Sequence, residues 1–387
     1  MVVTQIYELV NDAIKQATGQ ENLLQEDLGN VVDVGNTLEN VAGYDNFVRA
    51  LNDKIGKTIF HDRSYYGRIQ SVYRDSWEYG SILEKISFEM PEAEENESWE
   101  LEDRTSYDPN IFYKSKVSSK FYNKKRTFEV PLSITERQVK SSFHNVTRLN
   151  SFISGLRNYV NNAMRLALES LTMRTINNFT GQIIYDANNG GSLSNVSTNT
   201  CVNCLYLYNQ ASGQHLTTSN CIYDPNFIRF TANLMKNYQD YLTSPTILFN
   251  KGQQVRFTPA DKLHTIMLSQ FKNAVDTYLY GNKDEFKADV YSKLPPAETV
   301  VKWQGVNTSF SFGDASSIYV TTASGNDVQQ SGILAVMYDY DALGVMCENP
   351  RVTTNYNAKA EFWSEWHKYD AQYFNDFNEN YVVFLIA

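Results

Sequence analysis

Four side chains that can bind a metal lie close together in the second half of the chain. Cys201, Cys204, His215 and Cys221 fall within 21 residues, and thiolate and imidazole groups are the ligands that zinc prefers. The spacing matches no familiar zinc finger or knuckle, and only one CxxC pair is present. We therefore expect reduced cysteines in a loop-rich segment, with zinc binding left open. Four cysteines in 387 residues are too few for a disulfide scaffold.

Two other groups could support chemistry. Asp339 and Asp341 form a D-x-D pair that could hold a metal-bound sugar nucleotide, but an apolar strand ending in an acidic turn also explains them. Trp363 and Trp366 could stack a sugar or a base, although such aromatic residues are more often core or interface residues. Phosphate-binding glycine loops, HExxH and GxSxG are absent from the sequence. We predict no enzyme, no cofactor and no catalytic or metal residues.

Composition excludes other classes. Acidic residues number 44 and basic residues 34, giving a net charge of −10. This balance disfavours dedicated nucleic-acid binding and polybasic membrane association. No apolar run approaches the ~18 residues of a transmembrane helix. Hydrophobic residues at 42% are sufficient for a sizeable core, and 26 tyrosines suit partly hydrated interfaces.

The elements that must position any site begin with helices predicted at 2–18 and 45–57 and short strands at 58–60 and 71–73. Residues 85–130 read as a long hairpin with eight acids between 89 and 103 and six bases between 114 and 126. An isolated hairpin of this kind would be a solvated surface, whereas in an assembly it could dock on an identical neighbour. The predicted intersubunit contacts are Glu92, Glu94, Glu95, Glu97, Lys114, Lys116, Lys120, Lys124 and Lys125.

A long helix follows. Thr135 and Gln138 form a capping box, a break is expected near 144–147, and the main helix spans 148–179, or about 48 Å. Residues 186–200 read as a flexible loop. Beyond it we predict helices at 226–242 and 259–280, the latter with Thr258 as N-cap, and strands at 246–249, 299–303, 318–321, 333–338 and 381–386.

This order of elements resembles the major capsid protein of tailed double-stranded DNA bacteriophages, with the Hong Kong 97-type fold. Four stretches read like such proteins: Ile55-Gly-Lys-Thr-Ile-Phe, Phe128-Glu-Val-Pro-Leu-Ser-Ile-Thr-Glu-Arg-Gln-Val, Met173-Arg-Thr-Ile-Asn-Asn and Asn378-Glu-Asn-Tyr-Val-Val-Phe. The resemblance runs from about Phe47 onward and depends more on element order than on any single motif.

The resemblance implies an α+β fold with an N-terminal arm, an extended β-hairpin loop, a peripheral domain with a long spine helix and an axial α/β domain. The implied divisions are an arm (1–56), the first part of the peripheral domain (57–84), the extended loop (85–130), the peripheral domain with its spine helix (131–185), the axial domain (186–345) and the C-terminal part of the peripheral domain (346–387).

The implied function is structural. Hexamers and pentamers would form an icosahedral shell around packaged double-stranded DNA, which the inner face contacts non-specifically. A separate scaffolding protein and a portal protein are implied partners, with assembly in the host cytoplasm, location in the virion and no membrane. An encapsulin-like nanocompartment shell around an enzyme cargo is the alternative, and particle contents would distinguish the two.

Overall fold

The structure is a computed structural model that describes most of the chain beyond residue 100. The described residues are 3–18, 24, 34, 69–74, 83–90, 93, 100–135, 137–138, 146–188, 193–280, 296–304 and 309–387. The predicted helix at 45–57 and the predicted strand at 58–60 lie outside these ranges. Within them, every helix is too short or too polar to cross a lipid bilayer.

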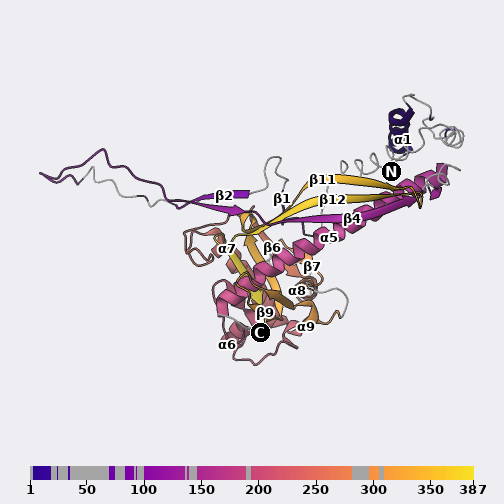
Figure 1. The fold of residues 1–387 in the computed structure, drawn as a ribbon. Helices are drawn as coiled ribbons and strands as arrows, with labels where there is room; N and C mark the ends of the chain where they lie inside the picture. The colour runs from indigo at the N-terminus through magenta and orange to yellow at the C-terminus, as the bar shows by residue number, and fades with distance from the viewer. Residues whose placement is uncertain are drawn as a thin grey trace.

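A single long helix, α5 (Val146–Asn188), runs through the molecule beside both of its larger sheets (Figure 1). Its 43 residues span about 65 Å at 1.5 Å per residue. The predicted capping box before it is confirmed: the Thr135 amide donates to Gln138 Oε1 (3.0 Å) and the Gln138 amide donates to Thr135 Oγ1 (3.3 Å). The helix continues nine residues beyond the predicted end at Phe179, because the added turns bury Ile183 and Ile184.

A four-stranded sheet lies along the N-terminal half of α5 (Figure 1). Its order is β1 (Tyr73–Arg74), β11 (Leu343–Asn357), β12 (Phe362–Asn375) and β4 (Lys125–Thr135). β11 and β12 form a long antiparallel hairpin, and β12 also pairs antiparallel with β4. Phe128 stacks on Tyr369 at 5.3 Å on the face that packs toward the helix. Trp363 is buried in this sheet, in agreement with the predicted core role.

A five-stranded sheet forms the second core. Its order is β5 (Cys201–Asn203), β13 (Tyr381–Leu385), β10 (Ile333–Asp339), β6 (Leu263–Leu268) and β7 (Glu298–Val300). Around it lie α6 (Cys204–Ser212), α7 (Pro225–Thr243) and α8 (Ser269–Tyr280), with the small β8–β9 hairpin (Ile318–Thr321, Asp327–Gln330) against α5. All residues of β10 and β13 are buried, as expected for central strands.

The remaining described elements are small or peripheral. α1 (Val3–Thr18) agrees with the helix predicted at 2–18 and contacts α5. The 3-10 turns η2 (Cys221–Tyr223) and η3 (Tyr340–Ala342) and the short helix α9 (Phe312–Ala315) connect larger elements. β2 (Leu83–Phe88) and β3 (Val117–Tyr122) pair antiparallel and begin a hairpin that extends away from the body (Figure 1).

The predictions for residues 259–280 and 246–249 are wrong. Residues 259–280 form no continuous helix: 263–268 are strand β6 and only Ser269–Tyr280 are helical. Thr258 is not the N-cap of a helix. It is fully buried, and its hydroxyl accepts a hydrogen bond from Asn380 Nδ2 (3.3 Å). Residues 246–249 form only an isolated bridge from Thr246 to Arg256.

The last strand lies in a different sheet from β11 and β12. We expected residues 346–387 to return together to the part of the molecule that holds the spine helix. β11 and β12 do so, but β13 pairs with β5 and β10 in the five-stranded sheet. Its unbroken apolar sequence suits a strand that is buried on both faces.

Candidate assembly site

The β2–β3 hairpin has two chemically different faces. Antiparallel register places Lys85 opposite Lys120 and Ser87 opposite Ser118 on one face. The other face carries Ile86 opposite Ser119 and Phe88 opposite Val117, because directly paired residues point the same way. The alternation of side chains along each strand therefore separates a cationic face from an apolar face.

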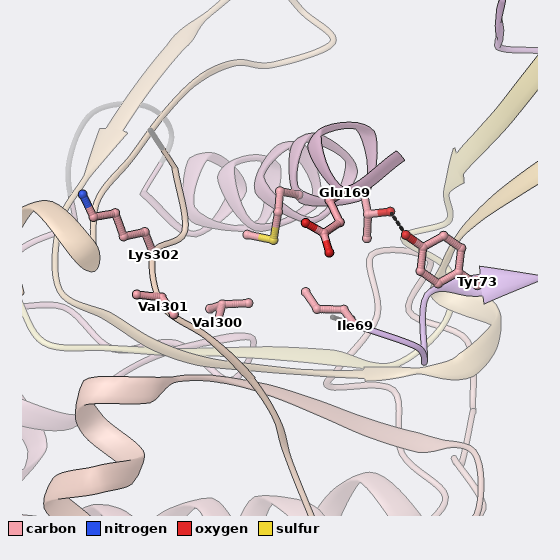
Figure 2. A pocket seen from close by; sticks show the side chains of 8 residues that line it. Ile69, Tyr73, Glu169, Val300, Val301 and Lys302 are labelled. Atoms are coloured by element: carbon pink, nitrogen blue, oxygen red, sulfur yellow. Dashed lines mark hydrogen bonds between the residues drawn. The ribbon is translucent and has the colours of Figure 1, made fainter. Parts of the chain in front are cut away.

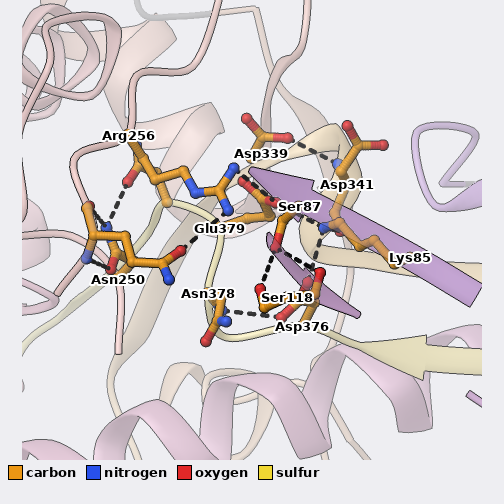
Figure 3. A network of polar contacts seen from close by, with 12 residues as sticks. Lys85, Ser87, Ser118, Asn250, Arg256, Asp339, Asp341, Asp376, Asn378 and Glu379 are labelled. Carbon is orange, nitrogen blue, oxygen red and sulfur yellow. Dashed lines mark hydrogen bonds and ion pairs between the residues drawn. The ribbon is translucent and has the colours of Figure 1, made fainter. Parts of the chain in front are cut away.

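The cationic face is held against the body by a buried carboxylate (Figure 3). Lys85 Nζ lies 2.8 Å from Asp376 Oδ2, and Lys120 Nζ lies 2.8 Å from Asp376 Oδ1. Lys85 also lies 2.7 Å from Glu379 Oε1, which is 3.7 Å from Arg256 Nη1. Lys85, Lys120, Asp376, Glu379 and Arg256 are named the hairpin latch here. The latch joins the hairpin to the turn between β12 and β13.

Charge pairing governs the titration of this latch. Burial alone would raise the pKa of Asp376, but the lysine ammonium groups outweigh it and hold the pKa below the usual carboxyl range. Burial likewise lowers the pKa of Lys85, and the two carboxylates more than reverse that effect, so the pKa is raised. Asp376 and Lys85 are therefore both charged at neutral pH.

The apolar face of the hairpin is open to solvent. Phe88 is 64% exposed, Phe121 63%, Ile86 55% and Val117 52%. The arm beyond the strands continues this character, since Leu101, Ile111, Phe112 and Tyr113 are also exposed. Contiguous exposed apolar surface of this kind marks interaction sites.

The predicted contact residues divide into three groups. Glu92, Glu94, Glu95 and Glu97 lie outside the described residues. Lys116 pairs with Glu89 at 3.3 Å within the hairpin, Lys120 belongs to the latch, and Lys125 pairs with Glu348 at 2.8 Å. Lys114 and Lys124 are exposed. The structure thus assigns three of the five lysines to ion pairs within one chain.

A second ionic cluster fixes the start of β4, where the hairpin returns to the sheet. Arg351 Nη1 lies 2.8 Å from Asp370 Oδ2, and the Thr127 hydroxyl donates to Asp370 Oδ1 at 2.6 Å. Burial would raise the pKa of Asp370, but Arg351, Thr127 and Lys125 together hold it far below its usual range. The base of the hairpin is therefore attached to the body at two points.

The Cys/His cluster and the D-x-D pair, which were the candidates for ligand binding, have structural explanations. Cys201, Cys204 and Cys221 are buried free thiols, and burial raises the pKa of Cys201 and Cys221 to about 12. His215 is exposed, and the described residues contain no cluster of three potential metal ligands. Asp339 accepts the Asp341 amide at 2.8 Å as the cap of η3, so this D-x-D is a turn.

Comparison with known proteins gives the decisive observation. A profile of the family described as Phi29-like phage major capsid protein matches residues 8–385. The chain belongs to this family. The capsid protein is accordingly a structural component of a tailed-phage head and of the virion, it forms a homo-oligomeric shell, and it is not an enzyme. The predicted relationship is confirmed, and the encapsulin alternative is displaced.

Solved structures of similar shape also come from phage capsids, at low identity. The capsid protein is similar to a chain in the capsid of Staphylococcus phage Andhra, at 9% identity over 84% of this chain and 87% of that chain, with a TM-score of 0.49. Two others belong to the mature capsid of bacteriophage PhiM1 (9% identity, 84% and 88% covered, TM-score 0.40) and to the capsid of cyanophage P-SCSP1u (7% identity, 82% and 86% covered, TM-score 0.42). No curated protein matches. The family match carries the assignment.

Sequence reasoning about the capsid protein missed the latch and the apolar face. Asp376 and Glu379 lie more than 250 residues from Lys120 and sit in an unremarkable turn sequence, so no local pattern pointed to them. The apolar face had a usable signal, because Ile86 and Phe88 alternate with Lys85 and Ser87. The prediction for this segment was based on its charged residues and not on that alternation.

Proposed function

We propose that the capsid protein has the Hong Kong 97-type architecture and tiles an icosahedral shell as hexamers and pentamers around packaged double-stranded DNA. A scaffolding protein and a portal protein are its proposed partners during assembly. The mixed α+β fold, with a long helix that runs beside a four-stranded and a five-stranded sheet, supports this architecture. The net charge of −10 supports only weak, non-specific contact with the DNA.

The proposal also divides the chain into an arm, a peripheral domain, an extended loop and an axial domain. Residues 346–380 accompany the peripheral domain, whereas β13 contributes to the axial core. The other divisions are an arm at 1–56, peripheral segments at 57–84 and 131–185, an extended loop at 85–130 and an axial domain at 186–345.

The extended loop is the proposed contact between neighbouring subunits. One observation carries this: a latched cationic face leaves an apolar face exposed on a projecting two-stranded hairpin. A two-stranded hairpin is marginal by itself, and exposed Phe88 and Phe121 gain free energy only when another surface covers them. In a shell of identical subunits, that surface is supplied by another copy.

Replacing Ile86 and Phe121 together by Asp tests this role. The expected product is a soluble subunit with normal circular dichroism that forms no shells by sedimentation or electron microscopy. The matched control is Tyr223→Asp, since Tyr223 is 65% exposed but belongs to η2 and not to the hairpin. Wild-type shell yield from the double variant would contradict the proposed contact.

The charged residues offer a second, weaker contact. Lys114 and Lys124 are exposed and could meet the acidic segment of a neighbour. Reversing Lys120, Lys124 and Lys125 to Glu should also block shells, and reversing Glu94, Glu95 and Glu97 to Lys should partly restore them. Because Lys120 and Lys125 hold the hairpin to its own body, Lys114→Glu with Lys124→Glu is the cleaner test. Unchanged assembly at low salt would count against an electrostatic contact.

A further inference from the structure

A pocket opens beside the middle of α5, on its border with β7 (Figure 2). Its volume is about 190 Å³, and its walls include Ile69, Met173, Val300 and Val301. Tyr73 closes one side, where its hydroxyl accepts a hydrogen bond from Thr172 Oγ1 at 3.3 Å. Apolar walls of this size suit one aromatic ring, since a cavity of about 150 Å³ holds benzene.

The pocket has one acidic group, the carboxylate of Glu169, which points into it in Figure 2. Its described ionic partner is Arg165 on the next turn of α5, with Nε at 3.4 Å from Oε1 and both side chains partly in solvent. An occupant should therefore combine an apolar ring with a hydrogen-bond donor at its tip. Tyrosine has that combination.

The pocket continues into a longer hollow. A second space of about 540 Å³ shares Glu169, Met173 and Lys302 with the first and follows α5 as far as Tyr319. Leu166, which is 67% exposed, lines it. The two spaces together are named the α5 groove here. Its volume exceeds what a single side chain would fill, so a segment of chain is the fitting occupant.

The extended loop supplies such a segment. Phe112 and Tyr113 are 87% and 74% exposed, the most exposed large apolar side chains in the described part of the chain. They lie within five residues of Val117, the first residue of β3, and thus at most about 18 Å from the start of that strand. In Figure 1 the hairpin projects from the opposite side of the body to β7, so this segment is directed away from its own groove.

We propose that the α5 groove binds Phe112 and Tyr113 of a second copy of this chain. The ring of Tyr113 enters the pocket and its hydroxyl donates to the Glu169 carboxylate, while Phe112 covers Leu166. This rests on the proposed function, because it names the surface that receives the hairpin. The contact joins two different surfaces head to tail, and such contacts generate rings when the rotation closes.

Cross-linking within assembled shells tests the pairing. The double variant Tyr113→Cys with Val301→Cys is treated with a short bis-maleimide and run on a denaturing gel. We expect a ladder of linked subunits that ends at pentamers and hexamers. The single variants should give none, because three native cysteines are fully buried and Cys347 is half-buried. The matched control Tyr107→Cys with Val301→Cys, from the same arm, should also give none.

A second measurement needs no cysteines. Tyr113→Phe and Glu169→Gln each weaken the proposed hydrogen bond, and each should raise the subunit concentration needed for shell assembly about tenfold. The double variant should be no worse than either single variant, because both changes affect the same contact. If the double variant raised the required subunit concentration by the product of the two single effects, the proposed pairing would be overturned.

The outcomes separate this inference from the proposed function. Shells that form without a ladder, or with dimers alone, overturn the groove assignment and leave the shell-forming role intact. A ladder in the Tyr107 control equal to that of Tyr113 also overturns it. Failure of the wild-type chain to form shells, with or without scaffolding protein, overturns the proposed function itself.

Discussion

Removing the charge at the centre of the latch should release the hairpin while leaving both cores folded. Asp376→Asn keeps the shape of the side chain but takes away the anion shared by Lys85 and Lys120. Asp376 is only 2% exposed, and its contact with Lys85 is largely shielded from water. A hydrogen bond to a charged group contributes about 1.5–3 kcal/mol. The Lys120 contact is 38% exposed on the lysine side and adds about 0.5 kcal/mol after solvent screening.

The sum, about 2–3.5 kcal/mol, is centred on roughly a hundredfold change in the docking equilibrium. Because an undocked two-stranded hairpin is marginal in water, undocking should expose the amides that pair β2 with β3. Hydrogen exchange of the unassembled subunit measures this directly. We expect protection in β2 and β3 to fall up to about a hundredfold in Asp376→Asn, with protection in β10 unchanged.

Acid should have the same effect on the wild-type subunit. The folded-state pKa of Asp376 is depressed, so its stabilisation is complete above the ordinary carboxyl pKa of about 3.9. It is lost as pH falls below that value and through the lower folded-state pKa. Asp376→Asn should lack this acid-dependent loss. Lys116→Gln is the control, since its pair with Glu89 is exposed and weak. Unchanged β2–β3 protection in Asp376→Asn, or equal loss in β10, would refute the latch.

Three further predictions concern the subunit itself. Val160→Ala should lower the free energy of unfolding by about 2 kcal/mol by leaving a cavity, whereas Leu166→Ala on the exposed face of the same helix should change the denaturation midpoint little. Gly332→Ala should abolish soluble folded protein, because its new Cβ would overlap the carbonyl oxygen of Ile386, just after β13. Gly325→Ala is the control: its positive φ is similar but the space around it is open, so it should lower the free energy of unfolding by only about 1–2 kcal/mol. The three buried cysteines of 201–221 should resist thiol reagents until unfolding, and a chelator should leave the melting temperature unchanged; a chelator-induced fall would indicate bound metal.

The sequence was most informative where local pattern and burial agree. The strand predicted at 318–321 has the bounds of β8, and the capping box at Thr135 forms as predicted. Central strands such as β13 were visible because burial on both faces leaves an unbroken apolar run. Helix α5 was found from its apolar stripe, but its end was placed too early because the final turns pack against elements far away in the sequence.

Predictions failed where long-range contacts determine the structure. β12 was missed because Glu365 and His367 occupy buried positions and disguise the alternation, and these two side chains pair with each other at 3.2 Å. β6 was read as part of a helix because its six residues carry no turn signal before α8. The latch could not be predicted, since its anion and its cations come together only when the whole chain is folded.

The position of β13 between β5 and β10 in the five-stranded sheet restricts when a newly made chain can become a subunit. β5 and β10 both pair with β13, so until residues 381–385 have left the ribosome each of these strands has an unpaired edge. A chain interrupted before Tyr381 would lack the strand that joins β5 to β10, and one interrupted before Glu379 would also lack that latch residue. Incomplete chains should then be removed by proteolysis or aggregation before they meet a growing shell. Only chains that have been translated through β13 should then be able to join the lattice.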